Sequence, residues 1–126
     1  MSFRTDRARV RGLGTAGEGV HHWWSQRLSS VALVPLGILF LIPFGRALGG
    51  GYEAMQAVYS VWWNAFVAAA FILVGSLHLA QGLQVVIEDY VHDKKARTAL
   101  LIATNLFGWG LAATGVFAVA TILFGS

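Results

Sequence analysis

Three long stretches without fixed charge constrain this chain more than any other feature of its sequence. The first lies between Arg27 and Arg46, the second between Glu53 and Glu88, and the third runs from Arg97 to the C-terminus. A helix of about 20 mainly apolar residues crosses the roughly 30 Å hydrocarbon core of a membrane, and a charge in that core is costly. We therefore expect an all-α membrane protein with three transmembrane helices.

The composition agrees with a membrane protein and excludes several other classes. Of the 126 residues, 56% are hydrophobic and 12% are charged, whereas a soluble domain carries about 25% charged residues. The chain has no cysteine, which excludes disulfides, thiolate metal sites and cysteine nucleophiles. Its N-terminus is rich in arginine, which in so apolar a chain predicts contact with anionic lipid and not with nucleic acid.

The uncharged stretches divide the chain into a polar tail and one anchor. Residues 1–20 are polar and glycine-rich, which predicts a flexible N-terminal segment, and residues 21–126 form the anchor. Pro35 and Pro43 predict a kink in the first span, which should end at Gly49–Gly51. We expect the three spans at about 28–48, 63–86 and 100–124, the second continuing as a helix to about Tyr90.

The distribution of lysine and arginine predicts the orientation in the membrane. Eight of the nine lie before the first span or between the second and third, and only Arg46 lies between the first and second. Positively charged segments stay on the cytoplasmic side. We therefore expect the N-terminus in the cytoplasm and the C-terminus in the periplasm. Aromatic residues between the first two spans predict a segment in the membrane interface.

Small residues form a stripe along the third span. Gly108, Ala112 and Gly115 recur at helical spacing, which lets two helices approach closely. The stripe could pack within this chain or against a partner membrane subunit. Three helices bury little of their own surface, so we expect a partner, with the anchor packed in a bundle against it.

His78 lies about midway along the second span. An ionisable side chain at that depth predicts a function, although a histidine hydrogen-bonded to a neighbouring helix would also explain it. Because a helix turns 100° per residue, Gly75 and Gly82 flank this histidine on the same face, one turn to either side. Two glycines there favour either a flat group such as a haem ring close to the backbone, or the close packing of another helix.

Two polar residues follow at the end of the second helix. Asp89 comes eleven residues after His78, which places both on nearly the same face, about 16 Å apart at 1.5 Å per residue. The phenol of Tyr90 can donate a hydrogen bond to a carbonyl oxygen. The pair suggests a proton-linked redox site, and an ordinary helix end at the lipid headgroups is the alternative. Arg27, on the same side of the membrane, could hold a carboxylate, a haem propionate or a lipid phosphate.

A histidine, a glycine four residues later and an Asp-Tyr pair at eleven and twelve form a distinctive spacing, present here as His78, Gly82, Asp89 and Tyr90. This spacing resembles the second helix of the small hydrophobic membrane anchor subunit of bacterial succinate dehydrogenase (complex II). The entry segment before the first span is also similar, with either His21 or His22 as the matching histidine. The resemblance covers about residues 20–126, and sequence elements typical of the larger of the two anchors in such complexes are absent.

The resemblance implies a role for each matching residue. His78 would be one axial ligand of a b-type haem, with the second histidine on the partner anchor, and Gly75 and Gly82 would pack against the haem. Tyr90 would hydrogen-bond a ubiquinone carbonyl and Asp89 would support that site. Arg27 would lie near the haem propionates or the quinone pocket.

The implied protein is a membrane anchor of succinate:ubiquinone oxidoreductase in the bacterial inner membrane. Its partners would be the second, larger membrane anchor subunit, the iron-sulfur subunit, the flavoprotein subunit, ubiquinone and lipid. Succinate chemistry would take place on the soluble subunits, so this chain would carry no catalytic residue for it. The alternatives are the anchor of a fumarate reductase, and a non-catalytic scaffold or transporter subunit in which His78 would be a packing residue.

Overall fold

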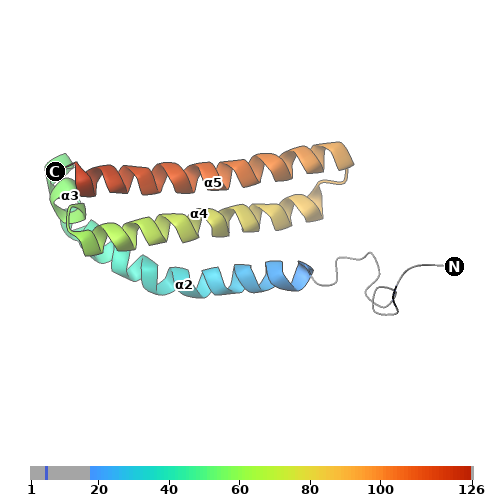
Figure 1. The fold of residues 1–126 in the computed structure, drawn as a ribbon, viewed down its shortest axis with the longest axis horizontal. Helices are drawn as coiled ribbons and strands as arrows, with labels where there is room; N and C mark the ends of the chain where they lie inside the picture. Colours follow the sequence, from blue (N-terminus) through green and yellow to red (C-terminus); the bar gives the residue numbers. More distant parts are fainter. Residues whose placement is uncertain (1–4, 6–17, 126) are drawn as a thin grey trace.

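The protein is all-helical over the residues that its computed structural model describes, which are residue 5 and residues 18–125. Figure 1 shows four helices, which in chain order are α2 (Glu18–Ala47), α3 (Gly51–Tyr59), α4 (Trp62–Tyr90) and α5 (Lys94–Phe124). Three are long and apolar enough to cross a membrane: Val20–Ala47, Trp62–Tyr90 and Lys94–Phe124. The predicted fold class, an all-α membrane protein with three transmembrane helices, is therefore confirmed. Most of the predicted polar tail, residues 1–20, lies outside the described residues.

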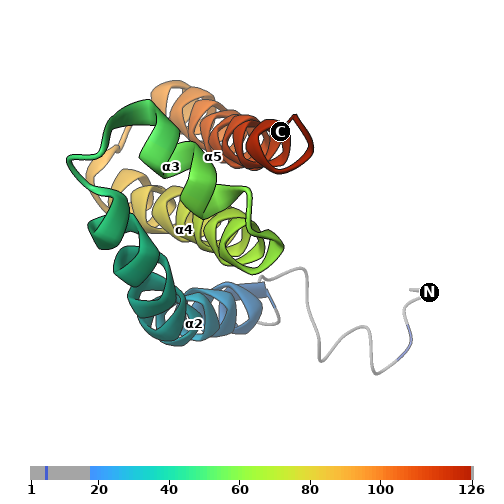
Figure 2. The same ribbon diagram turned by 90° about the vertical axis from the view of Figure 1, so that its left-hand side faces the viewer.

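Helix α4 is the centre of the arrangement. It packs against α2 on one side and α5 on the other, whereas the described residues of α2 and α5 do not contact each other. Figures 1 and 2 show the three long helices side by side, with the short α3 across one end. The molecule is thus an open layer of three helices with α4 in the middle.

The glycines after the first span end α2 as predicted. Gly49 and Gly51 have φ angles of 88° and 75°, in the left-handed region that residues other than glycine rarely adopt. Helix α2 itself continues through Pro35 and Pro43 and changes direction in its second half (Figure 2). Membrane helices tolerate proline in this way because neighbouring groups satisfy the freed carbonyls.

The segment expected at the membrane interface forms the additional helix α3. Tyr59, at its end, is 7% exposed and packs with Ala65, Ala68 and Val119 in the main apolar cluster. Burial raises the pKa of the Tyr59 phenol, and its hydroxyl donates to the carbonyl oxygen of Phe40 at 3.5 Å. Helix α3 therefore closes the end of the layer that lies far from the α4–α5 connection.

The small-residue stripe packs α5 against α4. Ala112 is 1% exposed, and a Cβ atom on Gly108 would lie 2.6 Å from the Cβ of Ala80, too close for any real contact. A Cβ atom on Gly115 would collide with the Ile72 side chain. Of the two alternatives for this stripe, the structure shows packing within the chain.

The long helices leave most of their apolar surface uncovered. Of the most apolar 18-residue window of each span, 0% is buried in α2, 17% in α4 and 11% in α5. Large exposed side chains include Val31, Ile38, Phe66 and Phe117. Lipid or another membrane subunit must cover this surface, because apolar area of this extent is not left in water.

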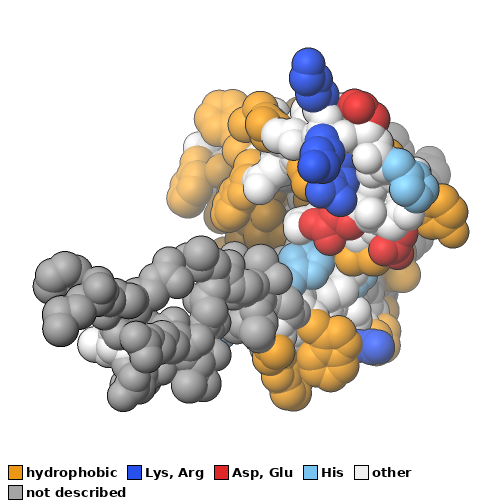
Figure 3. Space-filling model, turned by 90° about the vertical axis from the view of Figure 1, so that its right-hand side faces the viewer, with side chains coloured by type: hydrophobic (Ala, Val, Ile, Leu, Met, Phe, Trp, Pro, Cys, Tyr) orange, Lys and Arg blue, Asp and Glu red, His pale blue; other side chains and the backbone are white. Residues whose placement is uncertain are grey.

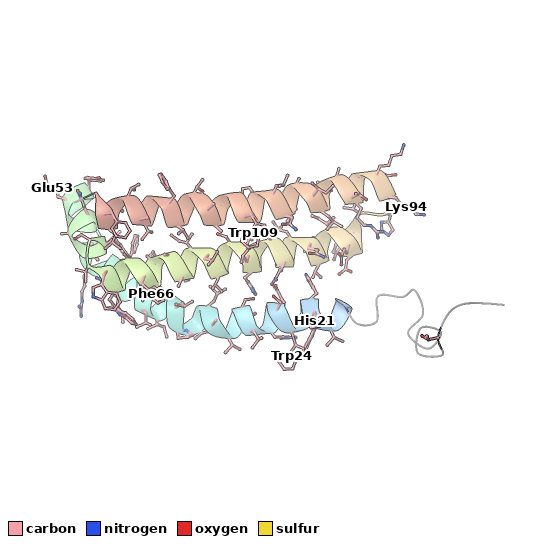
Figure 4. The ribbon with its side chains drawn as sticks, in the orientation of Figure 1. His21, Trp24, Glu53, Phe66, Lys94 and Trp109 are labelled. Carbon is pink, nitrogen blue, oxygen red and sulfur yellow. The ribbon has the colours of Figure 1, made fainter. Side chains whose placement is uncertain are left out.

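Charged residues gather at the end formed by the start of α2 and the α4–α5 connection (Figure 3). The side chain of Asp93 caps α5 there by accepting a hydrogen bond from the Ala96 backbone N–H at 2.8 Å. Figure 4 shows Lys94 at this end and Glu53 at the opposite end. We call the end with the α4–α5 connection the charged end.

Candidate functional site

His78 lies in the middle of α4, half-buried against α2. Its Nδ1 is 2.8 Å from the hydroxyl oxygen of Ser29, and its Nε2 is 3.4 Å from the side-chain nitrogen of Gln26. Both partners belong to α2, where they lie three residues apart and so share a face. The imidazole therefore links α4 to α2. Such contacts are expected both for a histidine that only packs two helices together and for one held in a fixed orientation as a metal ligand.

The glycines beside His78 face the same neighbour. A Cβ atom on Gly75 would lie 3.7 Å from Leu33, and one on Gly82 would lie 3.7 Å from Gln26, which are ordinary contact distances. Phe71, one further turn away, stacks on Phe40 of α2 with ring centroids 4.9 Å apart. Because neither glycine has a side chain, this face of α4 is smooth at these positions. The contacts with α2 there are at ordinary distances, so the two backbones are not unusually close.

A group of polar side chains surrounds the imidazole on the side toward the charged end. Gln81 donates a hydrogen bond from its side chain to the hydroxyl of Ser25 at 2.7 Å. The side-chain oxygens of Gln26 and Gln81 and the Nε2 of His22 are buried without a hydrogen-bond partner among the described residues. Buried polar atoms usually find a partner in protein or water, so these three atoms are available to water or to another polar group.

Two of these residues, His22 and Gln81, line a cavity of about 230 Å³, which we call the polar cavity for the polar side chains that enter it. His22 enters it from α2, Gln81 and Gln84 from α4, and Thr104 and Asn105 from α5. His21, by contrast, is exposed. The sequence left the choice between His21 and His22 open, and the structure directs only His22 into this cavity.

The other flank of His78 is apolar. A groove of about 280 Å³ is lined there by Phe71, Gly75 and Leu79 of α4 and Leu111 of α5, among others. With His78 at 0° on α4, Gly75 projects at about +60° and Gln81 at about −60°. The polar cavity and the apolar groove therefore lie on opposite flanks of α4, to either side of the direction in which His78 projects.

Asp89 and Tyr90 both lie exposed at the charged end, as the last two residues of α4. Tyr90 is 77% exposed, so its phenol is available to a molecule from outside the chain. Because α4 is continuous from Trp62 to Tyr90, the predicted spacing of about 16 Å from His78 to Asp89 along one face applies.

Arg27 lies on the exposed side of α2, with its guanidinium 5.4 Å from the centre of the Trp23 ring. Within the described part of the chain it forms no ion pair with Asp89. Ser30, one turn further on, donates its hydroxyl to the Gln26 carbonyl of its own helix at 2.8 Å. The structure thus brings Asp89 and Tyr90 together and leaves Arg27 available to a lipid, a cofactor or a partner subunit.

The residues around His78 fit the axial ligation of a haem iron. A ligating imidazole needs one nitrogen held by a hydrogen bond and the other available. The short contact at Nδ1 and the long contact at Nε2 match that requirement. Gly75 and Gly82, on the same face of α4, add no side chain of their own beside the ring.

Sequence reasoning identified His78 but missed Gln26, Ser29 and Gln81 as its surroundings. A signal was present, since Ser25, Gln26 and Ser29 lie on one face of α2, and His78 and Gln81 lie three residues apart on α4. What could not be read was the register between the two helices, which determines which polar groups meet.

The matching family model and two similar known proteins describe the same kind of membrane subunit. Residues 1–124 match the family model described as "Succinate dehydrogenase/Fumarate reductase transmembrane subunit". A "Succinate dehydrogenase hydrophobic membrane anchor subunit" from Paracoccus denitrificans is 36% identical over 100% of this chain and 97% of the relative. The protein of the same name from Rickettsia bellii is 32% identical over 83% of this chain and 84% of the relative. No solved structure matches the chain.

Proposed function

The chain belongs to the succinate dehydrogenase/fumarate reductase transmembrane subunit family, and from this premise we propose that it supplies one haem ligand and part of a quinone-reduction site. It is the hydrophobic membrane anchor subunit of a succinate dehydrogenase, part of an oxidoreductase complex and a multi-pass membrane protein. The relatives are named for succinate dehydrogenase, so we propose succinate oxidation over fumarate reduction. The comparisons give no support to a scaffold or transporter subunit.

His78 carries the haem proposal. It is a half-buried ionisable side chain in the middle of a membrane span, with its ring held by α2 at Nδ1. It would give its Nε2 to the iron of a b-type haem, and the second membrane anchor subunit would give the other histidine. A haem held by a histidine from each anchor subunit would serve electron transfer. Gly75 and Gly82 would leave room at its edge.

Tyr90 and Asp89 carry the quinone proposal. Ubiquinone needs protons and a polar niche for its ring, and lipid for its tail. Both are available at the charged end, where the Tyr90 phenol would donate a hydrogen bond to a quinone carbonyl oxygen. Asp89 would order water or orient the phenol. Arg27 would hold a haem propionate or line the quinone pocket, and a lipid phosphate is its alternative partner.

The proposed surroundings follow from the charge distribution and from the family. The charged end would face the cytoplasm, with the N-terminus on that side and the C-terminus in the periplasm of the bacterial inner membrane. The iron-sulfur and flavoprotein subunits would dock at this end and deliver electrons from succinate. The second anchor subunit would cover apolar surface of the long helices that this chain leaves exposed.

The replacement His78→Ala tests the haem proposal. We expect the purified complex to lose the low-spin haem bands of its reduced-minus-oxidised spectrum, while the anchor remains in the membrane. His92→Ala, which removes an exposed histidine at the charged end, is the matched control and should keep the bands. An unchanged low-spin spectrum in the His78→Ala complex would exclude His78 as the ligand.

A further inference from the structure

One ring nitrogen of His78 lies against a hydroxyl of α2. Nδ1 is 2.8 Å from the hydroxyl oxygen of Ser29, and that hydroxyl also lies 3.0 Å from the backbone carbonyl oxygen of Gln26. A hydroxyl donates once and accepts through its lone pairs. Ser29 can therefore donate its proton to the carbonyl and accept a hydrogen bond from a protonated Nδ1.

The second ring nitrogen has only a weak contact. Nε2 of His78 lies 3.4 Å from the side-chain nitrogen of Gln26, a long distance for a hydrogen bond. An iron bound at Nε2 would take the lone pair of that nitrogen and leave the ring proton on Nδ1, opposite the Ser29 oxygen.

We propose that Ser29 is a positioning residue, which holds the His78 ring in the tautomer and orientation that present Nε2 to iron. This inference rests on the proposed haem ligation. Ser29 is suited to the role because it lies on the neighbouring helix and is itself fixed by the Gln26 carbonyl. The backbone of His78 is thus fixed by α4, and its ring is held by a hydrogen bond to Ser29 of α2.

The hydrogen bond also affects the haem iron through the ligand. An imidazole that donates from Nδ1 to an oxygen becomes a more basic ligand, and loss of such an outer partner typically weakens metal binding by about 10- to 100-fold. A more basic ligand stabilises oxidised iron relative to reduced iron. Removing the Ser29 oxygen should therefore raise the haem midpoint potential and loosen the haem.

Ser29→Ala in the intact purified complex tests this inference, and Ser30→Ala is its matched control. Ser30 carries the same hydroxyl to the same Gln26 carbonyl, at 2.8 Å, but this hydroxyl does not contact the His78 ring. Redox titration of the haem bands should show a higher midpoint potential in Ser29→Ala, with a lower haem content after detergent washing. Ser30→Ala should match the unmodified complex in both measurements.

A second pair of variants separates the hydrogen bond from the shape of the side chain. Ser29→Thr keeps a hydroxyl and should keep the original potential, whereas Ser29→Val, which has the shape of threonine without the oxygen, should raise it. This comparison also decides the matter if Ser29→Ala fails to assemble. Equal potentials in the threonine and valine complexes would overturn the role of Ser29.

The outcome with His78→Ala distinguishes this inference from the proposed function. Loss of haem in His78→Ala, together with an unshifted potential in both Ser29→Ala and Ser29→Val, would overturn the positioning role alone. Retention of an unchanged low-spin haem in His78→Ala would overturn the ligation itself, and the role of Ser29 with it.

Discussion

At the scale of single residues, the two proposed roles lie at separate places along one helix. His78 lies half-buried at the middle of α4, held against polar groups of α2, and Asp89 and Tyr90 lie exposed at the end of α4. A ligand to iron gains from a dry and fixed position, whereas a quinone needs protons and so a place near water. The continuous helix α4 keeps the two positions in a fixed relation.

Tyr90→Phe should mainly impair quinone reduction. The ring would stay at the interface, but the hydroxyl that donates to the quinone carbonyl would be lost. We expect succinate-dependent ubiquinone reduction to fall by at least about tenfold, which corresponds to roughly 1.4 kcal/mol of lost interaction. Electron flow from succinate to a soluble artificial acceptor should be unchanged, because that acceptor takes electrons before the membrane. An equal fall in both activities would indicate an assembly role instead.

At the scale of helices, close packing of α4 and α5 supports the position of His78. Gly108 meets Ala80, two residues from His78, with no room for a Cβ atom between them. A shift of α5 would therefore move the α4 backbone beside the histidine.

Gly108→Ala should destabilise the anchor by forcing α4 and α5 apart. Overpacking of a close contact costs about 1–3 kcal/mol, which exceeds the gain of about 1 kcal/mol in helix propensity from replacing glycine. Gly110→Ala is the control, since a Cβ atom there would meet nothing within 4 Å. We expect the detergent-solubilised complex to unfold at a lower temperature with Gly108→Ala than with Gly110→Ala. The reverse order would show that α5 packs differently in the assembled complex.

The helices could be predicted from the sequence better than the contacts between them. Uncharged apolar stretches identify spans because the membrane penalises charge whatever the neighbours are, and the predicted end of the second helix at Tyr90 is confirmed. Helix α3 was not predicted, since a nine-residue helix depends on packing such as that of Tyr59 and not on its own propensity. The contact of Ser29 with His78 depends on the register of two helices, which no local pattern encodes.

At the scale of the whole molecule, the open layer of three helices is incomplete by itself. Over the described residues, helix α2 contacts α4 but not α5, and the most apolar part of α2 has no buried residue. Lipid and the other subunits of the complex, whose association membership of the family implies, would together cover this surface. The polar cavity opens on one face of the layer and the apolar groove on the other, so the two faces beside α4 differ in polarity.

The absence of cysteine from the sequence makes the predicted orientation straightforward to test. The test uses two variants with one cysteine each. Glu53→Cys lies in α3, and Lys95→Cys lies at an exposed position of the charged end. A maleimide that cannot cross membranes should label Glu53→Cys in intact spheroplasts and Lys95→Cys only after permeabilisation. The opposite pattern would place the charged end in the periplasm and would conflict with a quinone site that receives electrons from the cytoplasm.

In the proposed site, His78 gives its Nε2 to a haem iron while Ser29 holds its Nδ1. An experimental density map of the intact complex, purified with all its subunits, tests this most directly. We expect density for a haem between this anchor and its partner, with the iron bonded to Nε2 of His78 and the Ser29 oxygen at hydrogen-bond distance from Nδ1. A map in which His78 contacts only α2, with no iron at Nε2, would contradict the claim.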